Sequence, residues 1–252
     1  MDTRCGRSTI QRLVLWSADR TLVDVGRVAR EAYAQAFEQV VGKPMARVAP
    51  MTGRTDSEVI FETLALHGIE PTDHHLPEFS EALAAAFAAR KDAIKKYGRV
   101  LPGAKEAVTA LKKRRDAVQT VLTGTIEPNA RLTLATLGLG RALDLDVGGY
   151  GSENFPKSSL LQVAQARAAE KYSATFDQSS TVLITESPRD VQAARIGGAI
   201  VIGVVSGVST EAELHDMGAD LVLDDLHDTT TLVNSIDQLT DPTNGSPAAG
   251  SS

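Results

Sequence analysis

Hydrophobic and polar positions divide the chain into two regions with different patterns. Leu13-Val14-Leu15-Trp16 is a short apolar run that ends in Ser17-Ala18-Asp19, which is typical of a buried strand opening onto a polar loop. Residues 24 to about 98 then show only helical spacing. From Val100 onward, short apolar runs alternate with helical segments. The pattern therefore predicts one alternating unit that is interrupted early by a helical insertion.

Three helices are predicted in the insertion. The first follows Gly26, because apolar residues recur at three- and four-residue spacing until Gly42 and Pro44. The second covers Ser57–His67. The third covers Pro77–Tyr97 and is rich in alanine, which favours helix by intrinsic propensity. No segment of the insertion carries a strand signal.

The region after Val100 predicts a parallel sheet. Strands that alternate with helices form βαβ units with right-handed crossovers, and such units build a doubly wound sheet. The predicted strands are Ala117–Leu122, Leu143–Val147, Thr181–Ile184, Ala199–Val205 and Asp220–Leu223. The predicted helices are a segment ending at Arg115, then Pro128–Leu137, Ser158–Lys171, Pro188–Ile196, Thr210–Met217 and Thr229–Leu239.

These elements define a domain plan. Residues 11–23 and 99–239 form an α/β core, and residues 24–98 form an all-helical domain inserted into it. Residues 1–10 are predicted to be a disordered leader. Residues 240–252 are rich in Ser, Gly, Pro, Asp and Thr, so they bury too little apolar surface to offset the cost of ordering and are predicted to be a disordered tail.

Charge and composition exclude several classes of partner. The formal net charge is -6 and the pI is near 5.4, which argues against a nucleic-acid or anionic-membrane surface. Cys5 is the only cysteine, so no intrachain disulfide forms and nothing indicates an oxidising compartment. No apolar run approaches the roughly 18 residues that a membrane span needs. A cytoplasmic location is expected.

Polar residues follow several of the predicted strands. Ser17 and Asp19 follow the first, Thr123-Gly124 follows Val121-Leu122, and Thr185-Glu186 follows the strand ending at Ile184. Two further polar residues, Lys157 and Asp190, lie at the start of predicted helices. Because parallel strands deliver their following loops to one edge of a sheet, these side chains are expected to converge there.

The order and separation of these segments resemble the four motifs of the haloacid dehalogenase-like (HAD) superfamily, in its phosphoglycolate phosphatase-like branch with a helical cap. The resemblance covers residues 11–240 and implies a Rossmann-like core with the cap closing over the site. The family's first motif is an apolar strand followed by Asp-x-Asp-x-Thr. Its first Asp attacks a phosphoryl group and holds Mg²⁺, and its second acts as general acid and base. Asp19 and Thr21 match the second Asp and the Thr, but Ser17 stands at the nucleophile position.

The resemblance also implies roles for the other motifs. Thr52-Gly53-Arg54-Thr55-Asp56 is similar to the substrate loop of the cap, although Thr55 or Asp56 acting as a helix N-cap is a simpler role for it. Implied phosphate-binding groups are Thr123, Gly124 and Lys157, with Arg54 meeting an anionic substrate group, and implied Mg²⁺ ligands are Glu186, Asp190 and the backbone carbonyl of Ala18.

Three residues depart from the family pattern: Ser17, Arg20 where Gly is usual, and Glu186 where Asp is usual. A serine hydroxyl needs a base to become a nucleophile, and Asp19 is the nearest candidate in the sequence. The serine oxygen also lies closer to the backbone than a carboxylate oxygen, so a bound phosphoryl group is expected to lie too far away. Losing one carboxylate predicts weak Mg²⁺ binding, and no organic cofactor is expected.

Three hypotheses follow. The first is a degenerate catalytic site, poor or inactive as a phosphatase, that binds a small anionic ligand between cap and core. The second is an enzyme of altered chemistry in which Asp19 is a general acid or base without a phospho-aspartyl intermediate. The third is a residual Mg²⁺-dependent phosphatase that uses Ser17 or a directly attacking water.

Overall fold

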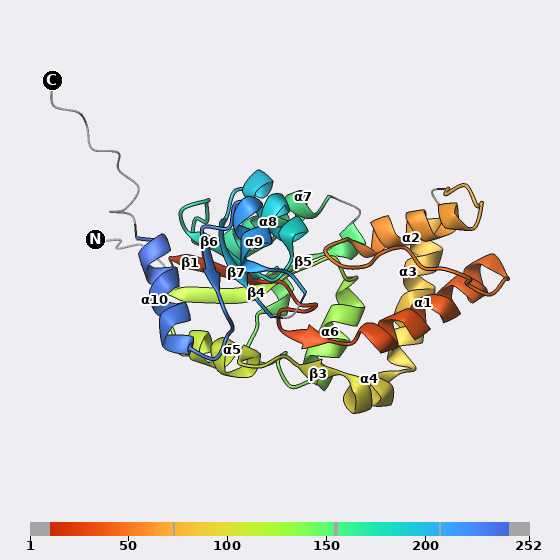
Figure 1. The fold of residues 1–252 in the computed structure, drawn as a ribbon, viewed down its shortest axis with the longest axis horizontal. Helices are drawn as coiled ribbons and strands as arrows, with labels where there is room; N and C mark the ends of the chain where they lie inside the picture. The colour runs from red at the N-terminus through yellow and green to blue at the C-terminus, as the bar shows by residue number, and fades with distance from the viewer. Residues whose placement is uncertain (1–10, 73, 154–155, 207, 242–252) are drawn as a thin grey trace, which may run out of the picture.

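A computed structural model describes residues 11–72, 74–153, 156–206 and 208–241. Its centre is a six-stranded sheet in which all neighbouring strands are parallel (Figure 1). The strand order β5-β4-β1-β6-β7-β8 places β1 inside the sheet between β4 and β6. The strands are β1 (Arg12–Trp16), β4 (Ala117–Thr123), β5 (Gly149–Tyr150), β6 (Thr181–Thr185), β7 (Ile200–Val204) and β8 (Leu221–Leu223).

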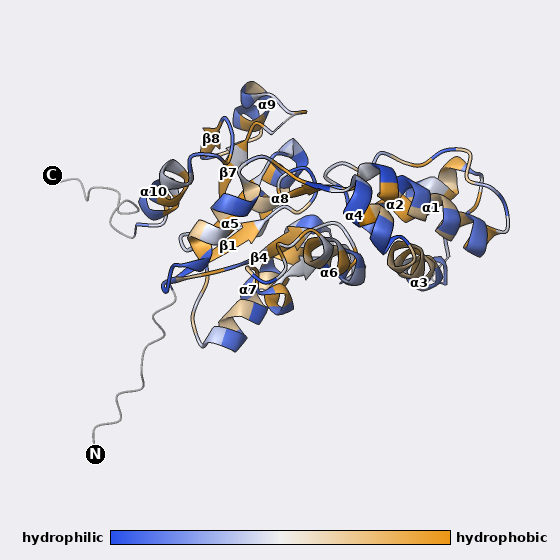
Figure 2. Cartoon of the chain, turned by 90° about the horizontal axis from the view of Figure 1, so that it is seen from below, coloured by the Kyte–Doolittle hydropathy of each residue, from blue (hydrophilic) through white to orange (hydrophobic). Residues whose placement is uncertain are grey.

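Helices cover both faces of the sheet because its strands are apolar on both sides. Val14 and Trp16 pack in one hydrophobic cluster with α5 (Ala104–Lys112) and α10 (Thr229–Leu239). Leu13 and Leu15 point to the other face, where the cluster contains residues of α7 (Lys157–Tyr172), α8 (Pro188–Gly197) and α9 (Glu211–Asp216). Figure 2 shows the same arrangement, with hydrophobic residues concentrated in the strands. The expected doubly wound α/β fold is confirmed.

The helices between β2 (Val23–Asp24) and β3 (Arg99–Val100) form a layer that we call the helical insertion. It contains α1 (Gly26–Val41), α2 (Asp56–Leu66), α3 (His75–Ala88) and α4 (Lys91–Tyr97), which share their own hydrophobic cluster. In the sheet-bearing part, α6 (Glu127–Thr136) packs against α3 and α4. β2 and β3 pair antiparallel at the base of the insertion. No strand occurs in the described residues between 27 and 97.

The prediction of one helix over Pro77–Tyr97 is wrong, because the chain turns between α3 and α4. Arg90 leaves helical geometry, with φ -104° and ψ 18°. Its guanidinium donates to the Ala86 carbonyl at 2.9 Å, which stabilises the end of α3. The turn leaves Ile94 fully buried in the insertion's cluster. Tertiary packing therefore overrides the helix propensity of the alanines.

The predicted strand Leu143–Val147 is also wrong. Leu145–Val147 is a 3₁₀ turn, and the strand at this position is β5, two residues further on. The Asp144 side chain accepts a hydrogen bond from the Asp146 N–H at 3.2 Å, so this backbone donor is satisfied locally. This local bond competes with strand pairing although Leu143, Leu145 and Val147 alternate as a strand would.

Some predictions concern the ends of the chain. The predicted leader and residues 242–252 of the predicted tail lie outside the described residues. Thr240 is buried, and its hydroxyl accepts a 2.7 Å hydrogen bond from Arg12 Nε. Among the described residues, no helix is both long and apolar enough to cross a membrane.

Candidate active site

The residues predicted from the motifs surround one cavity of about 500 Å³ between the sheet edge and the helical insertion. Ser17 follows β1, Thr123 ends β4 and Glu186 follows β6, so neighbouring strands deliver them to the same edge. Residues from α1 and from the loop before α2 close the opposite side. The structure brings together all the predicted site residues in the lining: Ser17, Ala18, Asp19, Arg54, Thr123, Gly124, Lys157, Glu186 and Asp190.

Asp190 is the centre of the hydrogen bonding. Lys157 Nζ lies 2.6 Å from Asp190 Oδ1, and both side chains are largely buried, with 9% and 1% exposed. The Ser17 hydroxyl donates to Asp190 Oδ2 at 2.8 Å, and the Thr185 hydroxyl donates to the same oxygen at 3.1 Å. The Ser17 proton is therefore directed at Asp190, which does not favour Asp19 as the base that activates Ser17.

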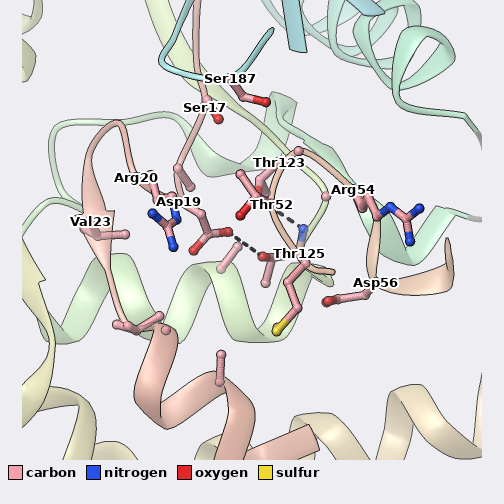
Figure 3. Close-up of a pocket in the computed structure, with 18 of the residues that line it drawn as sticks. Ser17, Asp19, Arg20, Val23, Thr52, Arg54, Asp56, Thr123, Thr125 and Ser187 are labelled. Atoms are coloured by element: carbon pink, nitrogen blue, oxygen red, sulfur yellow. Dashed lines mark hydrogen bonds between the residues drawn. The ribbon is translucent and has the colours of Figure 1, made fainter. Parts of the chain in front are cut away.

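Asp19 faces the cavity instead. Its Oδ2 accepts a 2.8 Å hydrogen bond from the Thr125 hydroxyl (Figure 3). Desolvation raises the pKa of Asp19, and although the Thr125 hydrogen bond and the Lys157 charge oppose this, the net shift remains upward. Asp19 therefore keeps a proton to higher pH than an ordinary aspartate does.

Glu186 is the second acidic group with an unusual environment. Its Oε2 is buried and has no hydrogen-bond partner among the described residues. Burial raises the pKa of Glu186, and the charge of Arg20 opposes that shift. The Glu186 backbone N–H donates to the Thr21 hydroxyl at 3.1 Å, which fixes the loop after β6 against the loop after β1.

The resemblance implied Mg²⁺ ligands at Glu186, Asp190 and the Ala18 carbonyl, and Mg²⁺ requires near-octahedral coordination by oxygen. Both oxygens of Asp190 are already engaged by Lys157 and Ser17. The Ala18 carbonyl accepts the N–H groups of Leu22 and Val23, each at 3.0 Å. No group of three or more acidic, His or Cys side chains in the described part of the chain has metal-binding geometry. As arranged, the donors do not fit an octahedral Mg²⁺ ion.

Gly124 is required where the insertion meets the sheet edge. A Cβ atom on Gly124 would lie 1.9 Å from the Arg54 carbonyl oxygen, so no larger residue fits. The Gly124 carbonyl accepts the Asp56 N–H at 2.7 Å. Beside it, the Thr123 hydroxyl accepts the Thr125 N–H at 3.2 Å (Figure 3). The loop before α2 therefore docks directly on the end of β4.

Arg54 and Thr55 both tie the loop before α2 to that helix, Arg54 by an ion pair and Thr55 as the N-cap. The Arg54 guanidinium forms an ion pair with Glu62 of α2, and Figure 3 shows it directed away from Asp19. Its charge is thus already neutralised within the insertion. Thr55 is the N-cap of α2, in a capping box with Glu58, which is the simpler role that the sequence offered for this loop.

Two contributors were missed by sequence reasoning. Thr125, the partner of Asp19, lies next to the Thr123-Gly124 motif and could have been found by position. The pair Tyr33–Asp56 had no signal, because α1 and α2 meet only in the folded state. The Tyr33 hydroxyl donates to Asp56 Oδ1, and the Ile126 N–H donates to Asp56 Oδ2 at 2.7 Å. Asp56 therefore joins the insertion to the loop after β4, and its burial raises its pKa to about 6.

This pair predicts a pH-dependent difference in stability. Because the pKa of Asp56 is raised on folding, the folded chain binds the proton more tightly, so this contribution is present below pH 3.8 and is lost as the pH rises through about 6. Asp56→Asn keeps the shape and removes the charge. Its stability relative to the unmodified protein should increase by about 2 kcal/mol between pH 4 and pH 7, measured by urea unfolding.

A second variant tests the same pair from the other side. Tyr33→Phe removes the donor to a buried carboxylate and should cost about 1 to 3 kcal/mol at pH 7 and less at pH 4. Tyr97→Phe changes an exposed tyrosine at the end of α4 and serves as the matched control. A stability difference between Asp56→Asn and the unmodified protein that does not vary with pH would contradict the assignment.

Comparison with known proteins places this architecture in a family. A family model described as haloacid dehalogenase-like hydrolase matches residues 14–195. No curated protein sequence matches the chain. Among solved structures, similar folds occur in proteins described as a hydrolase from Pseudomonas syringae, a predicted phosphatase from Clostridium acetobutylicum and a predicted phosphoglycolate phosphatase from Haemophilus somnus.

These structural likenesses extend over nearly the whole of each protein. The Pseudomonas hydrolase has 22% identity and a TM-score of 0.63, covering 90% of this chain and 99% of its own. The Clostridium protein has 15% identity and a TM-score of 0.64, covering 89% and 99%. The Haemophilus protein has 17% identity and a TM-score of 0.60, covering 90% and 100%. At these identities the likeness shows the fold, and the family model covers most of the chain. The chain therefore belongs to the haloacid dehalogenase-like hydrolase family.

Proposed function

We propose that this protein binds a small anionic molecule in the cavity between the helical insertion and the sheet, and that it does not hydrolyse phosphate esters through a phospho-aspartyl intermediate. One observation carries the proposal. The nucleophile position holds a neutral hydroxyl, and that hydroxyl donates to Asp190 at 2.8 Å. An oxygen committed in this way is neither an anionic nucleophile nor a strong metal ligand.

Cationic and hydroxyl groups in the lining support an anionic ligand. The lining contains the Thr123 hydroxyl, the guanidinium groups of Arg20 and Arg30, and the Lys157 ammonium, which is also paired with Asp190. Charged hydrogen bonds of this kind are the strong ones in anion recognition.

The acidic residues of the lining oppose the binding of an anion less than their number suggests. Asp24 is paired with Arg99 at 2.7 Å, and Asp190 is paired with Lys157 at 2.6 Å. Desolvation raises the pKa of both Asp19 and Glu186, so each carboxyl group loses its proton at a higher pH than an ordinary carboxyl group does.

Binding of orthophosphate, measured by titration calorimetry, tests the proposal. Thr123→Val removes one hydroxyl from the lining and should weaken binding by about tenfold or more. Thr120→Val is the matched control, because Thr120 lies on the same strand, is fully buried and has a hydroxyl without a partner among the described residues. Equal affinity in both variants, or no binding by the unmodified protein, would contradict the proposal.

A second function is favoured by Asp19. Its carboxyl group faces the cavity and its pKa is raised, which are properties of a general acid or base. In this alternative the protein is an enzyme of altered chemistry without a covalent intermediate. Asp19→Asn should then abolish turnover of a bound substrate without weakening its binding. If the protein only binds its ligand, the unmodified protein should show no turnover either.

A further inference from the structure

The cavity has two chemically different sides. The side formed by the sheet edge is polar, with Ser17, Asp19, Thr123 and Lys157 in its lining. The helical insertion closes the opposite side, and α6 contributes further apolar residues to the lining. Their apolar lining residues are Val25, Ala29, Val48, Ala49, Met51, Phe87, Ala130 and Leu134.

The apolar side is part of the protein's hydrophobic clusters. Ala29, Ala49 and Phe87 belong to the cluster of the insertion, while Ala130 and Leu134 belong to the cluster beneath the sheet. Phe87 is 3% exposed and Leu134 is fully buried, so packing holds them in place and they offer little surface to a ligand. Val48 and Met51 are partly exposed, so most of the accessible hydrocarbon on this side comes from them. We call these apolar lining residues the apolar wall.

Two charged groups of the helical insertion that lie in the lining, Asp56 and Arg54, are already occupied. The Tyr33 hydroxyl and the Ile126 N–H occupy both oxygens of Asp56. The Arg54 guanidinium is paired with Glu62. A ligand hydroxyl placed against Asp56 or Arg54 would lose water without gaining a new partner, which is unfavourable, whereas burying hydrocarbon against the apolar lining residues is favourable.

We propose that the ligand is a small amphipathic anion, with one anionic head group at the polar side and an alkyl or aryl group without hydroxyls against the apolar wall. This inference rests on the proposed function and narrows its ligand class. The cavity volume of about 500 Å³ lies in the range typical of small-molecule sites. Met51 and Val48, in the loop before α2, then determine specificity by presenting hydrocarbon to the tail.

Two matched phosphate monoesters test the proposal by titration calorimetry on the full-length protein. Propyl phosphate and glycerol 1-phosphate have the same carbon chain and head group, and differ by two hydroxyls. Propyl phosphate should bind at least tenfold more tightly, and each further methylene, up to pentyl phosphate, should add about fourfold. Pentanoate in the same series distinguishes a carboxylate head from a phosphate head.

Isosteric variants test whether the apolar wall causes the preference for propyl phosphate over glycerol 1-phosphate. Met51→Gln and Val48→Thr place polar atoms on the apolar wall and should reduce the preference for propyl phosphate severalfold. Both residues are partly exposed, so folding should be retained. Val41→Thr makes the same chemical change at a residue that packs on the insertion's cluster outside the cavity, and should leave the preference unchanged.

The outcomes separate this inference from the proposed function. If orthophosphate, glycerol 1-phosphate and propyl phosphate bind equally well, the protein binds anions but the amphipathic ligand class is wrong. If none of these anions binds, both proposals are wrong. An unchanged preference in Met51→Gln and Val48→Thr would also overturn the role of the apolar wall.

Discussion

Replacing Ser17 by aspartate is expected to raise Mg²⁺-dependent hydrolysis of an aryl phosphate monoester by about 100-fold. A carboxylate at this position would supply both the missing nucleophile and a negative charge beside Asp190 and the unpartnered oxygen of Glu186. Because three carboxylates would then lie together, the same variant should gain thermal stability when Mg²⁺ is added. The unmodified protein should gain much less.

The control for this prediction is Ser17→Asn, which adds a side chain of the same shape without its charge. It should gain neither hydrolysis nor stabilisation by Mg²⁺. If Ser17→Asp is stabilised by Mg²⁺ but remains inactive, the cavity has been remodelled beyond its nucleophile, which favours the binding function or the Asp19 chemistry. If Ser17→Asn is as active as Ser17→Asp, the charge argument is wrong.

Replacing Lys157 by methionine is expected to destabilise the protein by about 3 to 5 kcal/mol. Lys157 and Asp190 form a largely buried ion pair at 2.6 Å, so removing one partner leaves the other charge uncompensated. Urea unfolding can be followed by the fluorescence of Trp16, because it is the only tryptophan and is fully buried in β1.

The double variant Lys157→Met with Asp190→Asn tests whether the pair is the cause. It removes both charges and keeps an acceptor for Ser17 and Thr185, so it should recover much of the lost stability. Recovery would appear as strong coupling in a double-mutant cycle. If the two single effects simply add, the ion pair does not account for the destabilisation.

Much of the fold was predictable because its signals are local. The alternation of apolar runs and helices after Val100 sets the parallel sheet, and Thr229–Leu239 matches α10 residue for residue. The two wrong elements share one feature. In Pro77–Tyr97 and Leu143–Val147, a side chain bonds to the backbone where the expected element breaks, Arg90 in the first and Asp144 in the second. In the first, the packing of Ile94 also overrides the local pattern.

The convergence of the site residues was predictable for a topological reason, since neighbouring parallel strands end at one edge. Their contacts were not. Nothing in the spacing of the sequence indicates that Ser17 donates to Asp190, that Arg54 pairs with Glu62, or that backbone N–H groups occupy the Ala18 carbonyl. These depend on side-chain orientation and on how the insertion docks.

The most direct test of the central claim is the initial rate of phosphate release from an aryl phosphate monoester, measured for the unmodified protein and for Ser17→Ala, with and without Mg²⁺. The Ser17 hydroxyl is neutral and bonded to Asp190, so both proteins should give rates no higher than the uncatalysed reaction under either condition. Robust Mg²⁺-dependent release by the unmodified protein that survives Ser17→Ala would contradict the claim, and would require water as the attacking group.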